Sequence, residues 1–376
     1  MNSISKLKYL AFACLLCTGC SENSKQKELD AKTENNEPLS IIFMIGDGMG
    51  LPQITTAFYF GEDTPNFQQF QHIGLIKTSS TSHEVTDSAA GATAFSTGEK
   101  TYNRAIGVSK DSMPQETILE QLQQKGYQTG LISLTSITHA TPAAFYAHVV
   151  DRDMHEDIAE QFTNTKIDFV AGGGRQFFNK RADGKNLFAK LLDNNYYLDT
   201  LQLSKTVSNK PHAYILADDG LPAIIEGRKD FLNEATSMAL NYFDEKKKPF
   251  FMMIEGSFID WGGHAENADM LITEVADFNR TLGTVLKYVE NHPNTLLIVT
   301  ADHETGGVSV GKFYETNKST GEKKEIPKKV AVYFNSNQHT AELIPVFAKG
   351  KGAELFQGIY ENNMIYNKIL EALNNK

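Results

Sequence analysis

Three apolar segments constrain the fold of this chain more than any other feature. They cover residues 39–45, 250–254 and 295–299, and each is almost continuously apolar. Runs of this kind are typical of strands that are buried on both faces of a parallel sheet. Because parallel sheets carry their ligand sites beyond the carboxyl ends of the strands, the residues that follow these runs are candidate site residues.

Acidic residues and histidines follow all three segments. A single aspartate or histidine at the end of a strand is more often a polar cap than a ligand, but six of them at equivalent places on three strands are not explained in this way. Carboxylate oxygen and neutral imidazole are both zinc ligands, so the pattern predicts a metal centre at this edge of the sheet. The six residues are Asp47, Glu255, Asp260, His264, Asp302 and His303.

The segments between the three strands alternate between helical and extended patterns. An amphipathic stretch at 115–124 is followed by a strand at 128–133, and helices are expected at 229–245 and 267–291. Such alternation is typical of an α/β fold in which helices cover both faces of a parallel sheet. A chain of 376 residues is long enough to bury a large single core.

A further unusual segment, TDSAAGATAFSTG at 86–98, contains mostly small residues. If it is helical, Ser88 lies in the first turn, where free N–H groups and the helix dipole favour an anion such as phosphate. No histidine adjoins Ser88 in the sequence, so we expect a metal ion to activate its hydroxyl group. The alternative is a small-residue helix that packs tightly on the sheet and has no chemical role.

Together these motifs resemble those of the alkaline phosphatase family, from the first apolar strand to the C-terminus. The resemblance rests on GDG at 46–48, TDSA at 86–89, EGS at 255–257 and TADH at 300–303. It implies an α/β three-layer sandwich with a central, mostly parallel sheet, and a small cap insertion at 312–329. It also implies hydrolysis of small phosphate monoesters at alkaline pH through a phosphoserine intermediate, with two Zn²⁺ ions and one Mg²⁺ ion as cofactors.

The resemblance also implies a role for individual residues. Ser88 is similar to the nucleophile that becomes phosphorylated, and Asp47 is similar to the carboxylate that bridges the second zinc and the magnesium. The other implied metal ligands are Asp260, His264 and His339 for the first zinc, Asp302 and His303 for the second zinc, and Thr141 and Glu255 for the magnesium.

The segment HATPAAFYAHVVDR resembles the stretch around the arginine that holds phosphate in this family, and it ends at Arg152. Arg152 would grip two phosphate oxygens bidentately, which a lysine cannot do. The alternative from the sequence alone is a surface salt bridge between Arg152 and its neighbour Asp151 or Asp153.

Three further residues complete the predicted site or its surroundings. His139 and Trp261 stand at positions that vary within the family, and we expect both near the substrate phosphate, with His139 also near the magnesium. Simple packing would also explain both residues. His148 is expected to pack rather than to bind a metal, because it lies inside the Thr-Pro-Ala-Ala segment and not at the end of a strand.

The net charge of this chain limits the kinds of partner that it is expected to bind. The formal net charge is −10, from 46 acidic and 36 basic residues, and no basic run with interleaved aromatic residues occurs. We therefore expect no recognition of nucleic acid. The resembled family is often dimeric, so a homodimer is possible, although the sequence gives no signal of an interface.

The N-terminal segment has the pattern of an export signal. Lysines precede a short apolar run that ends at Thr-Gly-Cys, which predicts a signal peptide at 1–19 and a lipid on Cys20. A polar stretch at 20–38 reads as a flexible tether, followed by the catalytic domain at 39–376. The protein is then expected to be exported and held on a membrane as a periplasmic or cell-surface lipoprotein. Simple cleavage and secretion is the alternative.

The cysteines agree with this interpretation. The chain has three of them, Cys14, Cys17 and Cys20, and all lie in the first 20 residues. Cleavage before Cys20 would leave one cysteine, so no disulfide is expected in the mature chain.

Two other functions compete with phosphomonoester hydrolysis. A phosphodiesterase or sulfatase of the same superfamily would use a similar two-metal site. Sulfatases need a modified nucleophile in a different motif, and such diesterases typically lack both the phosphate-holding arginine and the third metal site. A non-catalytic, tethered phosphate- or metal-binding protein is the second alternative, although it would have no need of Ser88.

Overall fold

The computed structural model describes residues 38–61, 64–204 and 209–375. Residues 38–376 form one compact unit. The predicted signal peptide, Cys20 and all but the last residue of the predicted tether lie outside the described residues. Within the described part, none of the helices combines the length and the apolar character that crossing a membrane requires.

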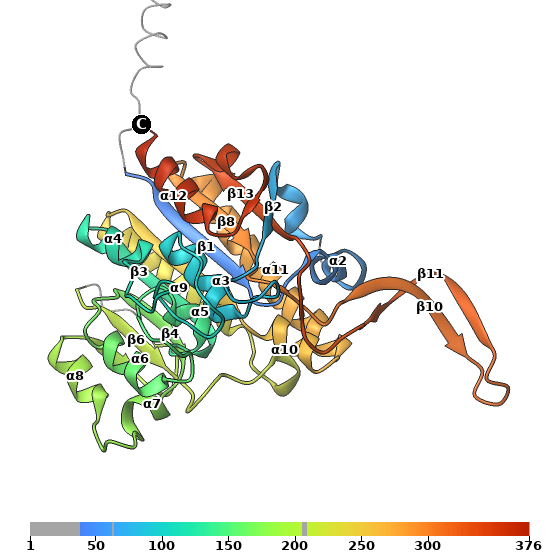
Figure 1. Ribbon diagram of the computed structural model, residues 1–376, viewed down its shortest axis with the longest axis horizontal. Helices are drawn as coiled ribbons and strands as arrows, with labels where there is room; N and C mark the ends of the chain where they lie inside the picture. Colours follow the sequence, from blue (N-terminus) through green and yellow to red (C-terminus); the bar gives the residue numbers. More distant parts are fainter. Residues whose placement is uncertain (1–37, 62–63, 205–208, 376) are drawn as a thin grey trace, which may run out of the picture. The chain divides into compact units, whose positions relative to one another are not determined.

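A sheet of ten strands forms the centre of the molecule, in the order β14-β2-β13-β8-β1-β7-β3-β4-β6-β5 (Figure 1). Among the described residues, β13 is antiparallel to both of its neighbours and every other pairing in this sheet is parallel. The strands are β1 (Ser40–Gly46), β2 (His72–Lys77), β3 (Gln128–Ser136), β4 (Phe169–Gly173), β5 (Tyr197–Asp199), β6 (His212–Ile215), β7 (Phe250–Gly256), β8 (Thr295–Thr300), β13 (Ile344–Gly350) and β14 (Gly358–Glu361).

The three apolar segments at 39–45, 250–254 and 295–299 are neighbours in this sheet. Strand β1 lies between β7 and β8, and Ile45 is the register partner of both Glu255 and Thr300. The carboxyl ends of the three strands are therefore level. This register places the residues after β1, at the end of β7 and after β8 at one edge, although those after β1 are more than 200 positions from the other two sets in the chain.

Helices cover both faces of the sheet. Helices α9 and α11 pack on one another and on β7, whereas α3, α4 and α5 belong to the other layer and contact β3 or each other (Figure 1). The predicted α/β fold with a mostly parallel central sheet is confirmed. The helices are α2 (Leu51–Phe60), α3 (Ser88–Thr97), α4 (Ile118–Gln124), α5 (Ala140–Ala143), α6 (His155–Phe162), α7 (Gln176–Asn179), α8 (Leu187–Asp193), α9 (Phe231–Lys246), α10 (Phe258–His264), α11 (Ala268–Asn291) and α12 (Met364–Asn374), with 3₁₀ turns η1 (Asn66–Gln69), η2 (Ile224–Glu226) and η3 (Ala353–Phe356).

Helix α4 begins three residues later than the predicted helix at 115–124. Thr117 is its N-cap residue: its side chain accepts a hydrogen bond from the backbone N–H of Glu120, and the Glu120 side chain accepts the N–H of Thr117. This capping box satisfies free N–H groups of the first turn and fixes the start of the helix at Ile118.

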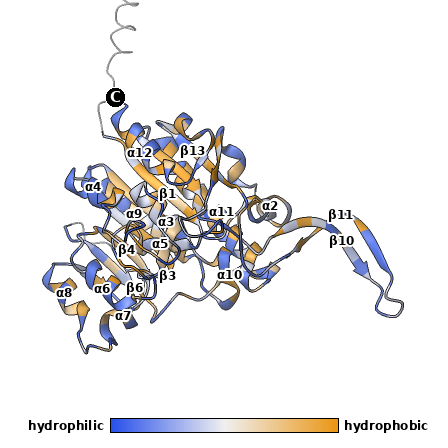
Figure 2. Cartoon of the chain, in the orientation of Figure 1, coloured by the Kyte–Doolittle hydropathy of each residue, from blue (hydrophilic) through white to orange (hydrophobic). Residues whose placement is uncertain are grey.

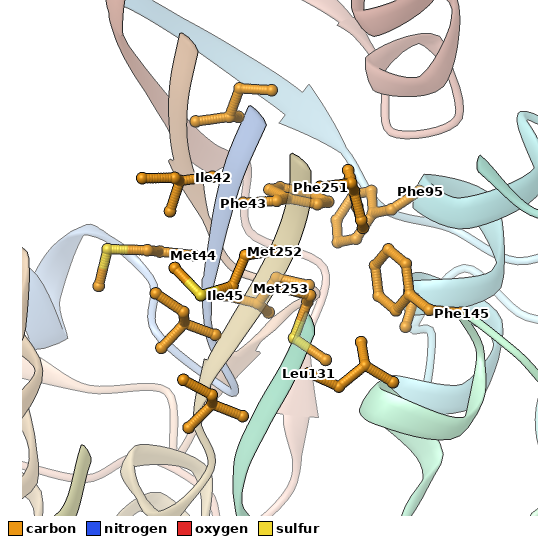
Figure 3. Close-up of a cluster of buried hydrophobic side chains, with 14 of the residues drawn as sticks. Ile42, Phe43, Met44, Ile45, Phe95, Leu131, Phe145, Phe251, Met252 and Met253 are labelled. Atoms are coloured by element: carbon orange, nitrogen blue, oxygen red, sulfur yellow. The ribbon is translucent and has the colours of Figure 1, made fainter. Parts of the chain in front are cut away.

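Apolar residues concentrate in the central strands, as the hydropathy colouring shows (Figure 2). Phe43 of β1 packs edge to face on Phe95 of α3, with ring centroids 5.6 Å apart, and on Phe145, which follows α5, at 6.1 Å (Figure 3). Burial of three aromatic side chains stabilises the contact between the sheet and the layer that contains α3. This contact packs the C-terminal half of α3 against β1.

The predicted cap at 312–329 lies in a two-stranded antiparallel ribbon, β10 (Ser309–Thr316) and β11 (Lys323–Tyr333), which projects from the body (Figure 1) and is largely hydrophilic (Figure 2). A second small pair, β9 (Glu304–Thr305) and β12 (His339–Thr340), lies at the base of the ribbon. Pairing of His339 with Thr305 brings His339 beside the end of β8.

Candidate active site

Ser88 is the first residue of α3 and is buried, with 3% of its surface exposed. Asp87 is the N-cap residue, and its Oδ1 accepts the N–H of Ala90 at 3.0 Å. The helix approaches the strand ends closely, because a Cβ atom at Gly91 would lie 3.0 Å from Cβ of Asp302. The small residues therefore do pack tightly, and this packing places the Ser88 Oγ 3.2 Å from Nε2 of His303.

One group of candidate metal ligands consists of Asp260, His264 and His339, whose ligand atoms lie within 4.8 Å of one another. The Nε2 atoms of the two histidines are 3.1 Å apart, and each is within 3.6 Å of Asp260 Oδ1. Asp260 and His264 are four positions apart on α10 and so share one face of that helix.

Backbone carbonyl groups hold both histidines in this orientation. Nδ1 of His264 donates to the carbonyl oxygen of Asn337 at 2.7 Å, and Nδ1 of His339 donates to that of Thr86 at 2.9 Å. Both Nε2 lone pairs then point into the group. Metal-binding histidines are typically held in this way, so the arrangement fits a zinc ion.

A second group surrounds His303. Its Nε2 lies 3.6 Å from Asp47 Oδ1 and 3.3 Å from Asp302 Oδ2, and Asp47, Asp260 and His303 also have ligand atoms within 4.8 Å of one another. The Nδ1 of His303 lies 3.2 Å from Oγ1 of Thr305, which donates to Asp260 Oδ1 at 2.5 Å. Asp260 and Thr305 therefore connect the two groups.

The carboxylates of this centre are crowded and incompletely paired. Asp47 Oδ1, Asp302 Oδ2 and Glu255 Oε1 are buried and have no hydrogen-bond partner among the described residues. Burial, followed by the neighbouring carboxylates Asp302 and Asp260, raises the pKa of Asp47 well above its usual value. Burial, followed by Asp260, raises the pKa of Asp302 to about 7. Bound cations would supply the missing positive charge and the missing partners, so the residues present fit metal ions.

The third group of candidate ligands, Asp47, Thr141 and Glu255, offers only oxygen as ligand atoms. Thr141 Oγ1 lies 3.5 Å from Asp47 Oδ2, and Glu255 is fully buried at the end of β7. Glu255 Oε2 accepts a hydrogen bond from Ser133 Oγ at 2.5 Å, which leaves Oε1 directed elsewhere. An all-oxygen set suits magnesium. Ser133 was missed in the sequence analysis, because a serine in a buried strand carries no motif.

A salt bridge connects Arg152 to Asp87, the residue that precedes Ser88. Its Nη1 donates to Asp87 Oδ2 at 3.1 Å, and its Nη2 lies 3.4 Å from Nε2 of His139. The alternative of a salt bridge to Asp151 or Asp153 is wrong for the described structure, because Arg152 pairs with Asp87 and both of those carboxylates bind the side chain of Arg104.

The two variable positions differ in burial. His139 is the N-cap residue of α5, which contains Thr141, and burial followed by Arg152 holds the pKa of His139 well below its usual value. It is therefore neutral. Trp261 follows Asp260 on α10, is 42% exposed and packs on Phe258 with ring centroids 4.5 Å apart. Trp261 thus packs on one side and reaches solvent on the other.

His148 lies apart from the metal groups. Its Nδ1 bonds to the carbonyl oxygen of Gly107 at 2.7 Å, and its Nε2 lies 3.1 Å from Glu120 of α4. This agrees with the expectation that His148 packs and does not bind a metal.

Comparison with known proteins gives one consistent result. Residues 39–337 match the family model of alkaline phosphatase. Alkaline phosphatase 4 of Bacillus subtilis is 30% identical over 99% of this chain and 97% of its own length, and alkaline phosphatase of Escherichia coli is 30% identical over 89% and 86%. The structure of alkaline phosphatase from the Antarctic bacterium TAB5 is 46% identical with a TM-score of 0.86, over 90% of this chain and 98% of that one. A mutant of the TAB5 enzyme, with Mg bound in the M3 site, is 45% identical with a TM-score of 0.87 over the same shares.

Proposed function

Since the chain belongs to the alkaline phosphatase family, we propose that Ser88 is the nucleophile with which it hydrolyses phosphate monoesters. The reaction class and the need for zinc and magnesium follow from family membership. The residues that carry the reaction are inferred from the site. The observation that supports Ser88 most is the position of its Oγ at the N-terminus of α3, 3.2 Å from Nε2 of His303.

The metal ligands are proposed from the three groups described above. Bound there, zinc lowers the pKa of a coordinated oxygen and polarises the phosphoryl group, and magnesium orders its carboxylate ligands. Asp260, His264 and His339 would hold one zinc, Asp302 and His303 with Asp47 the other, and Asp47, Thr141 and Glu255 the magnesium.

In the first step Ser88 Oγ attacks phosphorus: the bond from Oγ to phosphorus forms, the bond from phosphorus to the ester oxygen breaks with its electron pair on that oxygen, and the proton of the Ser88 hydroxyl passes through solvent to the departing alcohol. In the second step a water oxygen attacks phosphorus of the phosphoserine: the bond from phosphorus to Oγ breaks, one proton of the water passes to Oγ and regenerates the Ser88 hydroxyl, and inorganic phosphate leaves with the water oxygen. Arg152 would hold the phosphate oxygens throughout, and the N–H groups at the start of α3 favour their negative charge. His303 is not the general base, because its Nε2 lone pair is used when it binds a metal.

A comparison of monoester and diester substrates tests this assignment. Arg152 and the free N–H groups at the start of α3 can bind a phosphate with three free oxygens, which a diester does not offer. We expect kcat/KM for a nitrophenyl phosphate to exceed that for the bis-nitrophenyl ester by at least about a hundredfold, or about 2.7 kcal/mol in transition-state stabilisation. Equal rates, or a preference for the diester, would favour the phosphodiesterase alternative.

Arg152→Ala is expected to weaken the binding of substrate and inorganic phosphate. Removal of one charge-assisted hydrogen bond costs about 1.5–3 kcal/mol, which corresponds to roughly 10- to 150-fold in the inhibition constant of phosphate. Arg152→Lys serves as the control, because it retains the charge but not the bidentate geometry, and its effect should be intermediate. Unchanged inhibition by phosphate in Arg152→Ala would show that Arg152 does not hold the substrate.

For the N-terminal segment we propose lipid attachment at Cys20 and export, with the mature protein held as a periplasmic or cell-surface lipoprotein. The support is the short apolar run that ends at Thr18-Gly19-Cys20. A tether of roughly 18 flexible residues would span about 20–25 Å on average, enough to hold an acidic domain clear of anionic head groups.

Fractionation of cells that express the full chain tests the lipid. The mature protein should sediment with membranes, and Cys20→Ser should release it or stall its processing, whereas Cys17→Ser should leave it on the membrane. Mass spectrometry of the native N-terminus decides between lipid attachment at Cys20 and simple cleavage with secretion. A start beyond Cys20 without lipid would leave simple secretion.

A further inference from the structure

A second arginine, Arg104, occupies both carboxylates that flank Arg152. Its Nε donates to Asp151 Oδ2 and its Nη2 to Asp151 Oδ1, each at 2.8 Å, and Nη2 also donates to Asp153. The backbone N–H of Asp153 binds Asp151 Oδ1 at 2.9 Å, which holds the two carboxylates together. The paired acids on either side of Arg152 are thus bound to another cation.

The backbone of Arg104 contacts the same aspartate as Arg152. The N–H of Arg104 donates to Asp87 Oδ2 at 3.0 Å, and Nη1 of Arg152 donates to that oxygen at 3.1 Å. Arg104 has a φ of 78°, in the left-handed region that a non-glycine residue rarely adopts. A residue is held in such a conformation when its surroundings determine it strongly, and here both the N–H and the side chain are fixed.

We propose that Arg104 is a positioning residue that keeps Asp151 and Asp153 from pairing with the guanidinium group of Arg152, so that this group can bind the phosphate of the substrate. The inference rests on the proposed role of Arg152 as the residue that holds phosphate. Arg104 reaches Asp87 through its backbone and residues 151–153 through its side chain. It therefore connects the start of the nucleophile helix with the segment that carries Arg152.

Charge explains why Arg152 needs this partner. The bidentate bond to Arg104 lowers the pKa of Asp151 to about 2, so Asp151 is ionised at any pH at which the enzyme works. Without Arg104, the carboxylates of Asp151 and Asp153, which adjoin Arg152 in the sequence, would compete with phosphate for its guanidinium group. The effect should appear in the binding of phosphate more than in the rate of the chemical step.

Arg104→Gly isolates the side chain. Glycine adopts a φ of 78° without strain and retains the N–H that binds Asp87, so the side chain is lost while the backbone contact is kept. We expect the inhibition constant of inorganic phosphate and the KM for a nitrophenyl phosphate to rise about tenfold, with a smaller change in kcat and an unchanged metal content. In Arg104→Gly/Asp151→Asn/Asp153→Asn the competing charges are absent, and phosphate affinity should return to within about twofold of the wild-type value.

Arg280→Ala is the matched control. The Arg280 side chain is 49% exposed, as is that of Arg104, and it also binds two carboxylates, Asp230 and Asp277. This variant should leave phosphate affinity unchanged. The proposal is overturned if Arg104→Gly binds phosphate normally, or if the triple variant recovers no affinity, because the role would then be structural only. Arg152→Ala in the same assay separates a failure of the Arg104 proposal from a failure of the proposed role of Arg152. If Arg152→Ala also binds phosphate normally, Arg152 does not hold the phosphate.

Discussion

Replacement of Ser88 by alanine is expected to reduce steady-state turnover of phosphate monoesters by several orders of magnitude. The hydroxyl group lies at the start of α3 beside His303, where both the helix N-terminus and the metal groups converge. No phosphoserine can form without it, and the residual rate would come only from direct attack of water. The measurement is kcat for a nitrophenyl phosphate, with metal content and thermal unfolding determined on the same sample.

Ser96→Ala is the matched control for this substitution. Ser96 lies on the same helix, is also buried, and donates to the carbonyl oxygen of Ala144 at 2.6 Å. Its loss should lower stability by about 1 kcal/mol and leave the catalytic groups in place. Near wild-type turnover in Ser88→Ala, or an equal loss in Ser96→Ala, would refute the assignment of Ser88 as the nucleophile.

The central part of the fold follows from the sequence because burial on both faces leaves a direct signal. The runs that become β1, β7 and β8 are continuously apolar, and each ends in polar residues that a core would not tolerate. From those two facts the strands, the parallel sheet and the edge that carries the site can be predicted. Strands β2 and β13 were not predicted. Strand β13 runs antiparallel to both β2 and β8, and this direction depends on pairing between segments that are far apart in the chain.

The candidate ligands could be named from motifs, but the contacts that orient them could not. The carbonyl oxygens of Thr86 and Asn337 fix the two histidines of one group, and a backbone carbonyl has no signature in the identity of its residue. Arg104 is a similar case. Its role depends on two acidic residues nearly fifty positions later, whose proximity is set by the tertiary structure.

Removal of the metal ions is expected to inactivate the enzyme and to destabilise it most at high pH. Without cations, burial and like charges raise the pKa of Asp302 from 3.8 to about 7 and that of Asp47 in the same direction. The unfolded chain then releases these protons at lower pH than the folded chain does. The free energy of unfolding of the metal-free protein should therefore fall as the pH rises from about 4 to about 7, and stay low above that range.

Thermal unfolding of chelated and reloaded protein at about pH 5 and about pH 8 tests this expectation. Zinc with magnesium should restore activity and raise the unfolding temperature more at the higher pH, because cations compensate only those carboxylates that are ionised. Asp302→Asn removes one of the titrating groups, so its metal-free form should lose less stability across this range. Two results would contradict a centre in which metal ions hold buried carboxylates together. One is an equal rise in unfolding temperature at both pH values, and the other is fewer than two bound divalent ions per active chain.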